Sequence, residues 1–99
     1  MNIRFLDEAQ TELDETIDYY NSELPGLGKQ FLSEVLLSVE RISSFPEAWH
    51  QLSKNTRRCQ TSRFPYGLVY SVLKDEILIV SVSNLHREPN HWKARLKRS

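Results

Sequence analysis

A chain of 99 residues with balanced charge and one cysteine fits a single domain, residues 1–99, and cannot form an internal disulfide. No apolar run approaches the roughly 18 to 20 residues of a membrane span, and the N-terminus lacks the apolar stretch of a signal peptide, so we expect a cytoplasmic protein. The charge is divided: residues 1–56 hold four bases against ten acids, a net of −6, and residues 57–99 hold nine bases against three acids, a net of +6. This division indicates either a basic surface for an anionic partner or solvated acidic helices beside a solvated basic sheet.

The first helix is expected after a short strand at residues 3–5. Asp7 stands where a helix N-cap is expected, and Pro25-Gly26 ends the helix. Apolar residues recur every three or four positions and so share one face: Ala9, Leu13, Ile17, Tyr20 and Leu24. Acidic residues on the opposite face are expected to be solvated: Glu8, Glu12, Glu15 and Asp18.

A second helix is expected from about residue 27 to residue 44, where Phe45-Pro46 ends it. Its apolar stripe has helical spacing: Leu27, Phe31, Leu32, Val35, Val39 and Ile42. Because only a few residues separate the two helices, they are expected to fold back on each other as a helical hairpin.

The rest of the chain predicts strands. Residues 68–73 and 77–82 are short runs rich in β-branched and aromatic residues, and the polar residues 74–76 between them indicate the tight turn of a β-hairpin. Neither run alternates strictly, so both faces of this hairpin are expected to be covered at its centre. Shorter strands are expected at 48–53 and 57–62, and a short basic helix at 90–98 after Pro89.

Together these elements predict an α+β fold. The N-terminal αα-hairpin is expected to pack on one face of a small antiparallel β-sheet. The other face is expected to be partly polar, because only the short C-terminal helix is left to cover it. A basic, partly exposed sheet face is therefore the expected partner surface.

Candidate functional residues gather where the outer ends of the main hairpin meet. Antiparallel pairing brings residues 63–66 beside residues 84–92, an end that carries Arg63, His86, Arg87 and His91. The histidines could act as acid or base near neutral pH, and the arginines could hold a phosphate or an acidic partner residue. Alternatively, Arg87 locks the strand end, and the histidines are exposed residues without a role.

Arg57 and Arg58 stand on the preceding strand. The two-residue period of a strand places Arg57 on the face of Arg63 and Arg58 on the other face. Guanidinium groups held on a sheet suit phosphate or carboxylate, and solvated charge is the alternative. With an aromatic rim, the predicted partner-binding set is Arg57, Arg58, Arg63, Tyr66, Arg87 and Trp92.

No metal or cofactor site is expected. The three histidines, His50, His86 and His91, lack the spacing of zinc ligands, and no glycine-rich phosphate loop is present. Cys59 is expected to be a small buried apolar residue within a strand.

The motifs in their order resemble one protein family. Three segments look like those of the ParE/RelE toxins of bacterial type II toxin–antitoxin modules. They are the helical hairpin with Tyr19-Tyr20, Pro25-Gly26-Leu27-Gly28 and Phe31-Leu32, the segment Arg63-Phe64-Pro65-Tyr66 with Tyr70, and the segment Arg87-x-Pro89-x-x-Trp92. The resemblance covers nearly the whole chain. It implies two helices packed on an antiparallel sheet, and a toxin neutralised by a cognate antitoxin whose C-terminal segment wraps its surface.

The resemblance also implies a choice between two activities. ParE-like members block DNA gyrase, whereas RelE-like members cut mRNA in the ribosome. RelE-like cleavage relies on a basic cluster with an arginine at the position of Gly67, so this chain looks more like the ParE branch, with no catalytic residue and no sequence-specific DNA binding of its own. The alternative is a metal-free endoribonuclease that acts on mRNA at the ribosome and uses Arg63, His86, Arg87 and His91. A third reading is a harmless remnant or a plain protein-binding module.

Overall fold

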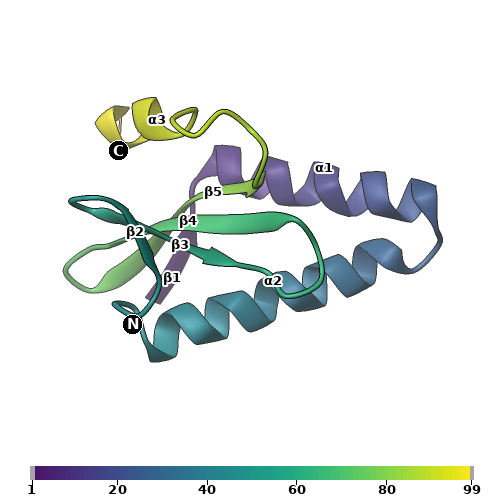
Figure 1. Ribbon diagram of the computed structural model, residues 1–99, viewed down its shortest axis with the longest axis horizontal. Coiled ribbons are helices and arrows are strands. Elements are labelled where there is room, and N and C mark those ends of the chain that lie inside the picture. Colours follow the sequence, from purple (N-terminus) through teal and green to yellow (C-terminus); the bar gives the residue numbers. More distant parts are fainter. Residues whose placement is uncertain (1, 99) are drawn as a thin grey trace.

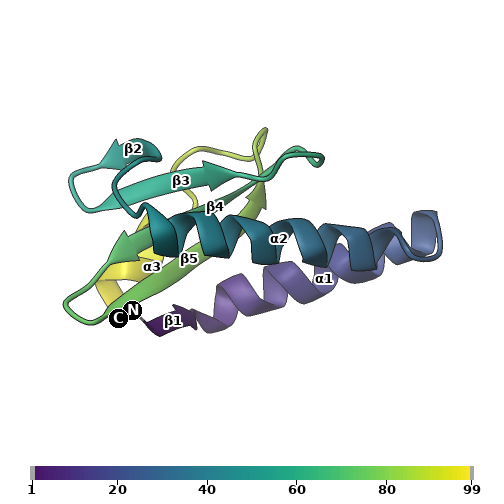
Figure 2. The ribbon, with the colours of Figure 1, turned by 90° about the horizontal axis from the view of Figure 1, so that it is seen from below.

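Two long helices lie side by side on one face of a five-stranded sheet, and a short third helix lies on the other side (Figures 1 and 2). The structure is a computed structural model that describes residues 2–98. Its elements, in chain order, are β1 (Asn2–Phe5), α1 (Asp7–Glu23), α2 (Leu27–Ser44), β2 (His50–Ser53), β3 (Thr56–Gln60), β4 (Tyr66–Val72), β5 (Glu76–Asn84) and α3 (Lys93–Arg98). The predicted α+β fold is confirmed.

The sheet has the strand order β1-β5-β4-β3-β2. The four strands from β2 to β5 pair antiparallel, as predicted, but β1 runs parallel to β5, with Asn2 opposite Glu76 and Phe5 opposite Ile79. The sheet is therefore mixed. The two strands β1 and β5 could pair in either direction because most of the chain separates them. A tight turn between them would have forced antiparallel pairing.

The hairpin of β4 and β5 buries both of its faces. On the helix side, Leu68, Tyr70, Ile77, Ile79 and Val82 join one core cluster with residues of α1 and α2. On the other side, a smaller cluster holds Val69, Leu78, Val80 and Trp92, with Leu52 and Leu96 packed against it. A register shift opposite Val69 and Tyr70 inserts an extra residue into β5. Such a bulge explains why this strand does not alternate strictly in sequence.

The helical hairpin begins differently from the prediction. The residue before α1 is Leu6 rather than Asp7, and no side chain caps the helix. The Leu6 N–H donates to Ile79 O (3.0 Å), so Leu6 continues the strand and Asp7 is already helical. Between the helices, Gly26 has φ +91°, a left-handed conformation that favours glycine.

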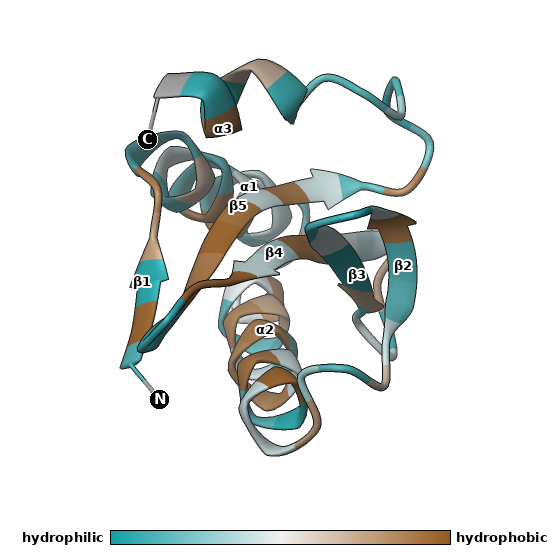
Figure 3. Ribbon diagram, turned by 90° about the vertical axis from the view of Figure 1, so that its left-hand side faces the viewer, coloured by the Kyte–Doolittle hydropathy of each residue, from teal (hydrophilic) through white to brown (hydrophobic). Residues whose placement is uncertain are grey.

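The far end of the helical hairpin projects beyond the sheet (Figure 1). Leu24, expected on the buried face, is therefore 58% exposed. Nearer the sheet, Phe31 is fully buried and its ring contacts those of Tyr20, Phe64 and Tyr66. This aromatic group joins α1 and α2 to the start of β4. Viewed end-on, hydrophobic residues run along β5, and α2, which lies against the sheet, carries both hydrophobic and hydrophilic residues (Figure 3).

Candidate functional site

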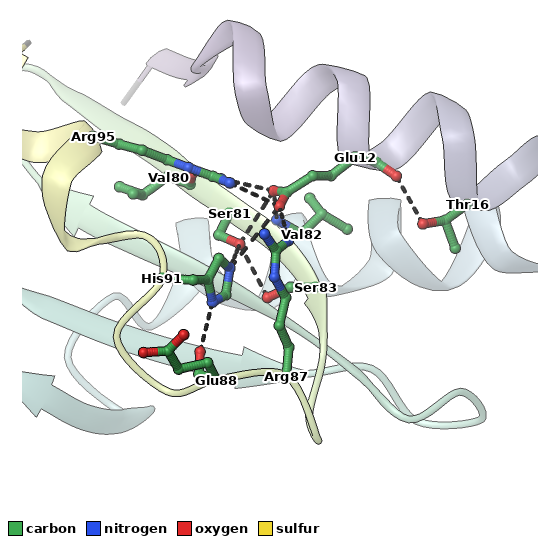
Figure 4. A network of polar contacts seen from close by, with 10 residues as sticks. All are labelled: Glu12, Thr16, Val80, Ser81, Val82, Ser83, Arg87, Glu88, His91 and Arg95. Carbon is green, nitrogen blue, oxygen red and sulfur yellow. Dashed lines mark hydrogen bonds and ion pairs between the residues drawn. The ribbon is translucent and has the colours of Figure 1, made fainter.

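A single carboxylate on α1 organises the end of β5 and the C-terminal segment (Figure 4). Glu12 Oε1 lies 2.8 Å from Arg95 Nη1, and Glu12 Oε2 lies 2.9 Å from Arg95 Nη2 and 2.8 Å from Arg87 Nη1. Ser81 Oγ lies 3.2 Å from Oε1 and 3.1 Å from His91 Nε2. We call Glu12, Ser81, Arg87, His91 and Arg95 the Glu12 network. Glu12 was expected in solvent, but its side chain is only 14% exposed.

The network forms because β1 is shorter than β5. The pairing of β1 ends at Ile79, so the next backbone groups on that edge of β5 face no strand. Val82 N–H donates to Glu12 Oε1 (3.1 Å), and Val80 O accepts from Arg95 Nη1 (3.0 Å). Buried backbone groups need such partners, and the two side chains replace the missing strand.

Charge and burial act in opposite directions on Glu12. Burial raises the pKa of its carboxyl, but hydrogen bonds from Arg95, from the Val82 backbone and from Ser81, together with the charge of Arg95, outweigh burial and lower the pKa. The same hydrogen bond raises the pKa of Arg95. The pair is therefore ionised, and it ties α1, β5 and α3 together.

A cavity of about 280 Å³ lies beside this network, under the segment that leads from β5 to α3. Its lining includes Arg58, His86, Arg87, His91 and Trp92. His86 is exposed, and its backbone N–H donates to Asn84 Oδ1 (2.8 Å). The structure thus brings Arg58 and three of the four predicted nuclease residues to one cavity. Arg63 does not line it.

Gly67 lies close to the side chain of Arg58, which lines this cavity. A Cβ atom on Gly67 would lie 2.8 Å from Arg58 Cδ and 2.9 Å from Arg58 Cγ. The side chain of Arg58 therefore occupies the space that a larger residue at position 67 would need. The sequence places no arginine at position 67, and the stem of an arginine from the neighbouring strand lies beside it.

Comparison with known proteins identifies the family. Residues 3–89 match the family described as "ParE toxin of type II toxin-antitoxin system, parDE". This chain belongs to the ParE toxin family. One similar solved structure is described as "Chromosomal ParDE TA system from P. aeruginosa", with a TM-score of 0.68, 18% identity, and coverage of 85% of this chain and 95% of that chain. At that identity the likeness concerns the fold. No curated protein matched the chain.

Family membership makes the chain the toxin of a type II toxin–antitoxin system, with an antitoxin as its partner. None of the helices in residues 2–98 has the length and apolar character to cross a membrane. Over the same residues, no three His, Cys, Asp or Glu side chains are grouped so as to hold a metal ion.

The remaining predicted residues of this ParE-family toxin are dispersed. Arg57 and Arg63 were expected on one strand face, but β3 ends at Gln60 and Arg63 lies exposed in the following loop. Arg57 Nη1 donates to Trp49 O (2.9 Å), beside a separate pocket that Tyr70 also lines. Tyr66 is half-buried against the ring of Phe31. Trp92 is only 3% exposed and packs in the smaller core cluster.

Sequence reasoning missed Glu12 and Arg95 as the centre of the Glu12 network. The available signal was position: Glu12 follows the buried Ala9 by three residues and precedes the buried Leu13 by one, so it borders the apolar stripe. Arg95 had no comparable signal, because it stands among several bases at the C-terminus.

Proposed function

We propose that this ParE-family toxin inhibits DNA gyrase by binding it, without catalysis of its own. The proposal rests on one observation: candidate catalytic side chains already bond to other groups of the same protein. Arg87 pairs with Glu12, and the ring nitrogens of His91 lie 3.1 Å from Ser81 Oγ and 2.8 Å from Glu88 O. A metal-free ribonuclease needs a base, an acid and a cation directed at one phosphate. Here two of the three candidates that meet at the cavity are occupied within the protein.

The test is a DNA supercoiling assay with purified toxin and gyrase. We expect supercoiling to fall with rising toxin concentration, and prior addition of the antitoxin to restore it. A parallel in vitro translation reaction should proceed at its normal rate. Full supercoiling at toxin concentrations that arrest growth would contradict the proposal.

One observation favours the RelE-like ribonuclease as a second candidate. One cavity is lined by two arginines and two histidines: Arg58, Arg87, His86 and His91. Their cations and imidazoles therefore lie near one another. Cleavage of mRNA in translating ribosomes, lost in a folded His86→Ala protein, would establish this alternative. Intact mRNA together with blocked supercoiling would exclude it.

The second part of the proposal is neutralisation in the cytoplasm by a cognate antitoxin with an acidic or amphipathic C-terminal segment. The uneven charge supports it, because residues 57–99 carry a net of +6. Arg63 is exposed, Arg57 and Arg58 are half-buried on opposite faces of β3, and the side chain of Arg87 is 48% exposed. An interface of ordinary size would bury roughly 1,200 to 2,000 Å². We expect no sequence-specific DNA binding by the toxin alone.

A further inference from the structure

Arg58 differs from the other arginines of the sheet and its covering segments. Arg4, Arg57, Arg87 and Arg95 each donate a hydrogen bond to a carboxylate or a backbone carbonyl. Within residues 2–98, the buried Nε of Arg58 has no hydrogen-bond partner. A guanidinium stays protonated at every relevant pH, so this donor cannot avoid its need for an acceptor by losing a proton.

Gly67, on the neighbouring strand β4, leaves room for the Arg58 side chain. Arg58 Cδ and Cγ lie 2.8 and 2.9 Å from the point where a Cβ of residue 67 would be, and Leu85 Cδ2 lies 3.1 Å from that point. Gly67 is buried at a φ that other residues also adopt, so backbone conformation does not require a glycine there. Close approach of the Arg58 side chain does require it.

The cavity beside Arg58 is suited to a short side chain that is partly apolar and ends in an oxyanion. Leu52, Val69 and Trp92 supply apolar walls, and Arg58 and His86 supply polar groups. Arg87, also in the lining, already pairs with Glu12, and the lining also includes the acidic residue Glu88. A nucleic acid would need exposed aromatic rings for stacking and a row of free cations for its phosphates. Trp92, the aromatic residue here, is 3% exposed, so these walls favour a protein side chain.

We propose that this cavity is an anchor site for one aspartate or glutamate side chain of the antitoxin, and that the Arg58 guanidinium shifts towards the cavity so that its buried Nε–H donates to the carboxylate. The inference rests on the proposed neutralisation by an antitoxin. Gly67 acts as a positioning residue, because it gives the Arg58 stem room to lie flat along the sheet. A carboxylate acceptor supplies the partner that Arg58 lacks, and hydrogen bonds between charged groups are the strong ones.

The first experiment uses the isolated, full-length, ¹⁵N-labelled protein. Its Arg58 Nε–H NMR resonance, identified by its loss in Arg58→Gln, is followed during titration with the peptide acetyl-Leu-Glu-amide. We expect a saturable shift with this peptide and none with the matched peptide acetyl-Leu-Gln-amide. In Gly67→Ala the guanidinium is still present but its stem is displaced, so the peptide-induced shift of the Arg58 resonance should shrink. The amide spectrum should remain that of a folded protein. Equal responses to both peptides, or an unchanged response in Gly67→Ala, would overturn the proposal.

A third titration separates the two sources of an oxyanion. If a short uridine oligonucleotide moves the Arg58 resonance at lower concentration than the glutamate peptide does, the site belongs to a nucleic acid and the antitoxin assignment is wrong. A response to the peptide alone supports the assignment.

The second experiment measures the affinity of the cognate antitoxin by calorimetry. Arg58→Gln should weaken binding roughly 10- to 100-fold, the loss expected for one hydrogen bond between charged groups. Arg4→Gln removes the same charge from an exposed pair with Glu76 at another edge of the sheet and should leave the affinity unchanged. Equal affinity of the Arg58→Gln and wild-type proteins would overturn the anchor but leave neutralisation intact. A protein that responds to the peptide but binds no antitoxin would refute neutralisation and the antitoxin as occupant, leaving a carboxylate site with another partner.

Discussion

Glu12 and Arg95 are 83 residues apart in sequence, yet their side chains form a bidentate ion pair. Oε1 lies 2.8 Å from Nη1, and Oε2 lies 2.9 Å from Nη2. Each of the two also bonds to the backbone of β5, at Val82 N and Val80 O. The pair therefore holds α3 against the sheet and closes the edge that β1 leaves open. The pair can close this edge because both side chains are largely buried: the Glu12 side chain is 14% exposed and the Arg95 side chain is 11% exposed.

Glu12→Gln should destabilise the toxin by roughly 3 kcal/mol. The substitution leaves Arg95 buried without a counter-charge, and breaking a buried pair from one side costs about 3–5 kcal/mol. Because the glutamine can still accept from Val82, the loss should fall at the low end. Urea unfolding followed by circular dichroism measures it, with Glu15→Gln on the exposed side of α1 as the matched control. Equal stability of all three proteins would show that the network contributes nothing.

The contribution of Glu12 should depend on pH in a defined direction. Its pKa is lowered in the folded state, so the stabilisation is fully present above the ordinary carboxyl value of 4.5 and is lost as the pH falls through the lower folded value. The stability difference between wild type and Glu12→Gln should thus be constant near neutral pH and vanish in acid. Urea titrations at a series of pH values test this, and a difference that persists at the lowest pH would be the contrary result.

Phe31→Ala should cost roughly 3–5 kcal/mol of folding stability, the usual range for truncating a buried phenylalanine. Phe31 is fully buried and its ring contacts three other aromatic rings. Leu36→Ala on the same helix is the control, because Leu36 is 53% exposed and its truncation should change stability by no more than about 0.5 kcal/mol. Thermal and urea unfolding measure both. Similar values for the two variants would mean that the buried face of α2 is wrongly assigned.

How much could be predicted from the sequence depended on the range of each interaction. The two long helices and the β4–β5 hairpin follow from spacing patterns within short stretches, and the structure confirms them. Asp7 failed as a cap because Leu6 is tied to Ile79, a partner that no local pattern reveals. The parallel direction of β1 was missed for the same reason.

The candidate site was less predictable than the fold. Helical periodicity assigned Glu12 to solvent, and only the arrival of Arg87 and Arg95 from the C-terminal segment makes its burial favourable. The contact of Arg58 with Gly67 depends on the register of β3 against β4, which places Gln60 opposite Gly67 and Arg58 opposite Val69. Strand register is a property of the folded sheet, so composition and spacing could not supply it.

Tyr70 should be among the last tyrosines to ionise. Burial raises its pKa to about 12, and its hydroxyl donates to Pro46 O. Because the folded-state value exceeds the ordinary 10.0, Tyr70 contributes stability that is present below pH 10.0 and is lost as the pH rises towards about 12. Tyr70→Phe should lose about 1 kcal/mol at neutral pH, the usual value of one hydrogen bond, and should lack this alkaline loss. Denaturant titrations on both sides of pH 10 test it; parallel curves for the two proteins would refute it.

His86→Ala and His91→Ala, singly and together, should leave toxicity intact. The proposed inhibition requires binding rather than proton transfer, and His91 serves the Glu12 network instead. Growth arrest after induction is the measurement, with circular dichroism as the control for folding. A folded, antitoxin-binding double variant without toxicity would move the assignment to the ribonuclease.

Arg57→Glu combined with Arg63→Glu should slow antitoxin association by about ten-fold or more and make it less dependent on salt. Reversing two positive charges weakens long-range attraction to an acidic segment, which acts mainly on the association rate. Stopped-flow mixing at low and high ionic strength measures the effect. Lys29→Glu together with Lys54→Glu, both exposed bases in the acidic half, provides a variant with the same charge change. If the two double variants behave alike, net charge rather than the arginine surface is responsible.

The position of the Glu12 network sets an order of events during synthesis. The helical hairpin leaves the ribosome first, but the strand that it contacts most, β5, is made last among the strands, and the cations that satisfy Glu12 follow after it. Until then α1 and α2 have no β5 on which to bury their apolar faces, and such long-range contacts form late. A nascent or truncated chain that stops before residue 95 therefore lacks a complete toxin fold. The folded toxin therefore forms only after the segment with Arg87 and Arg95 has left the ribosome, well after the helical hairpin.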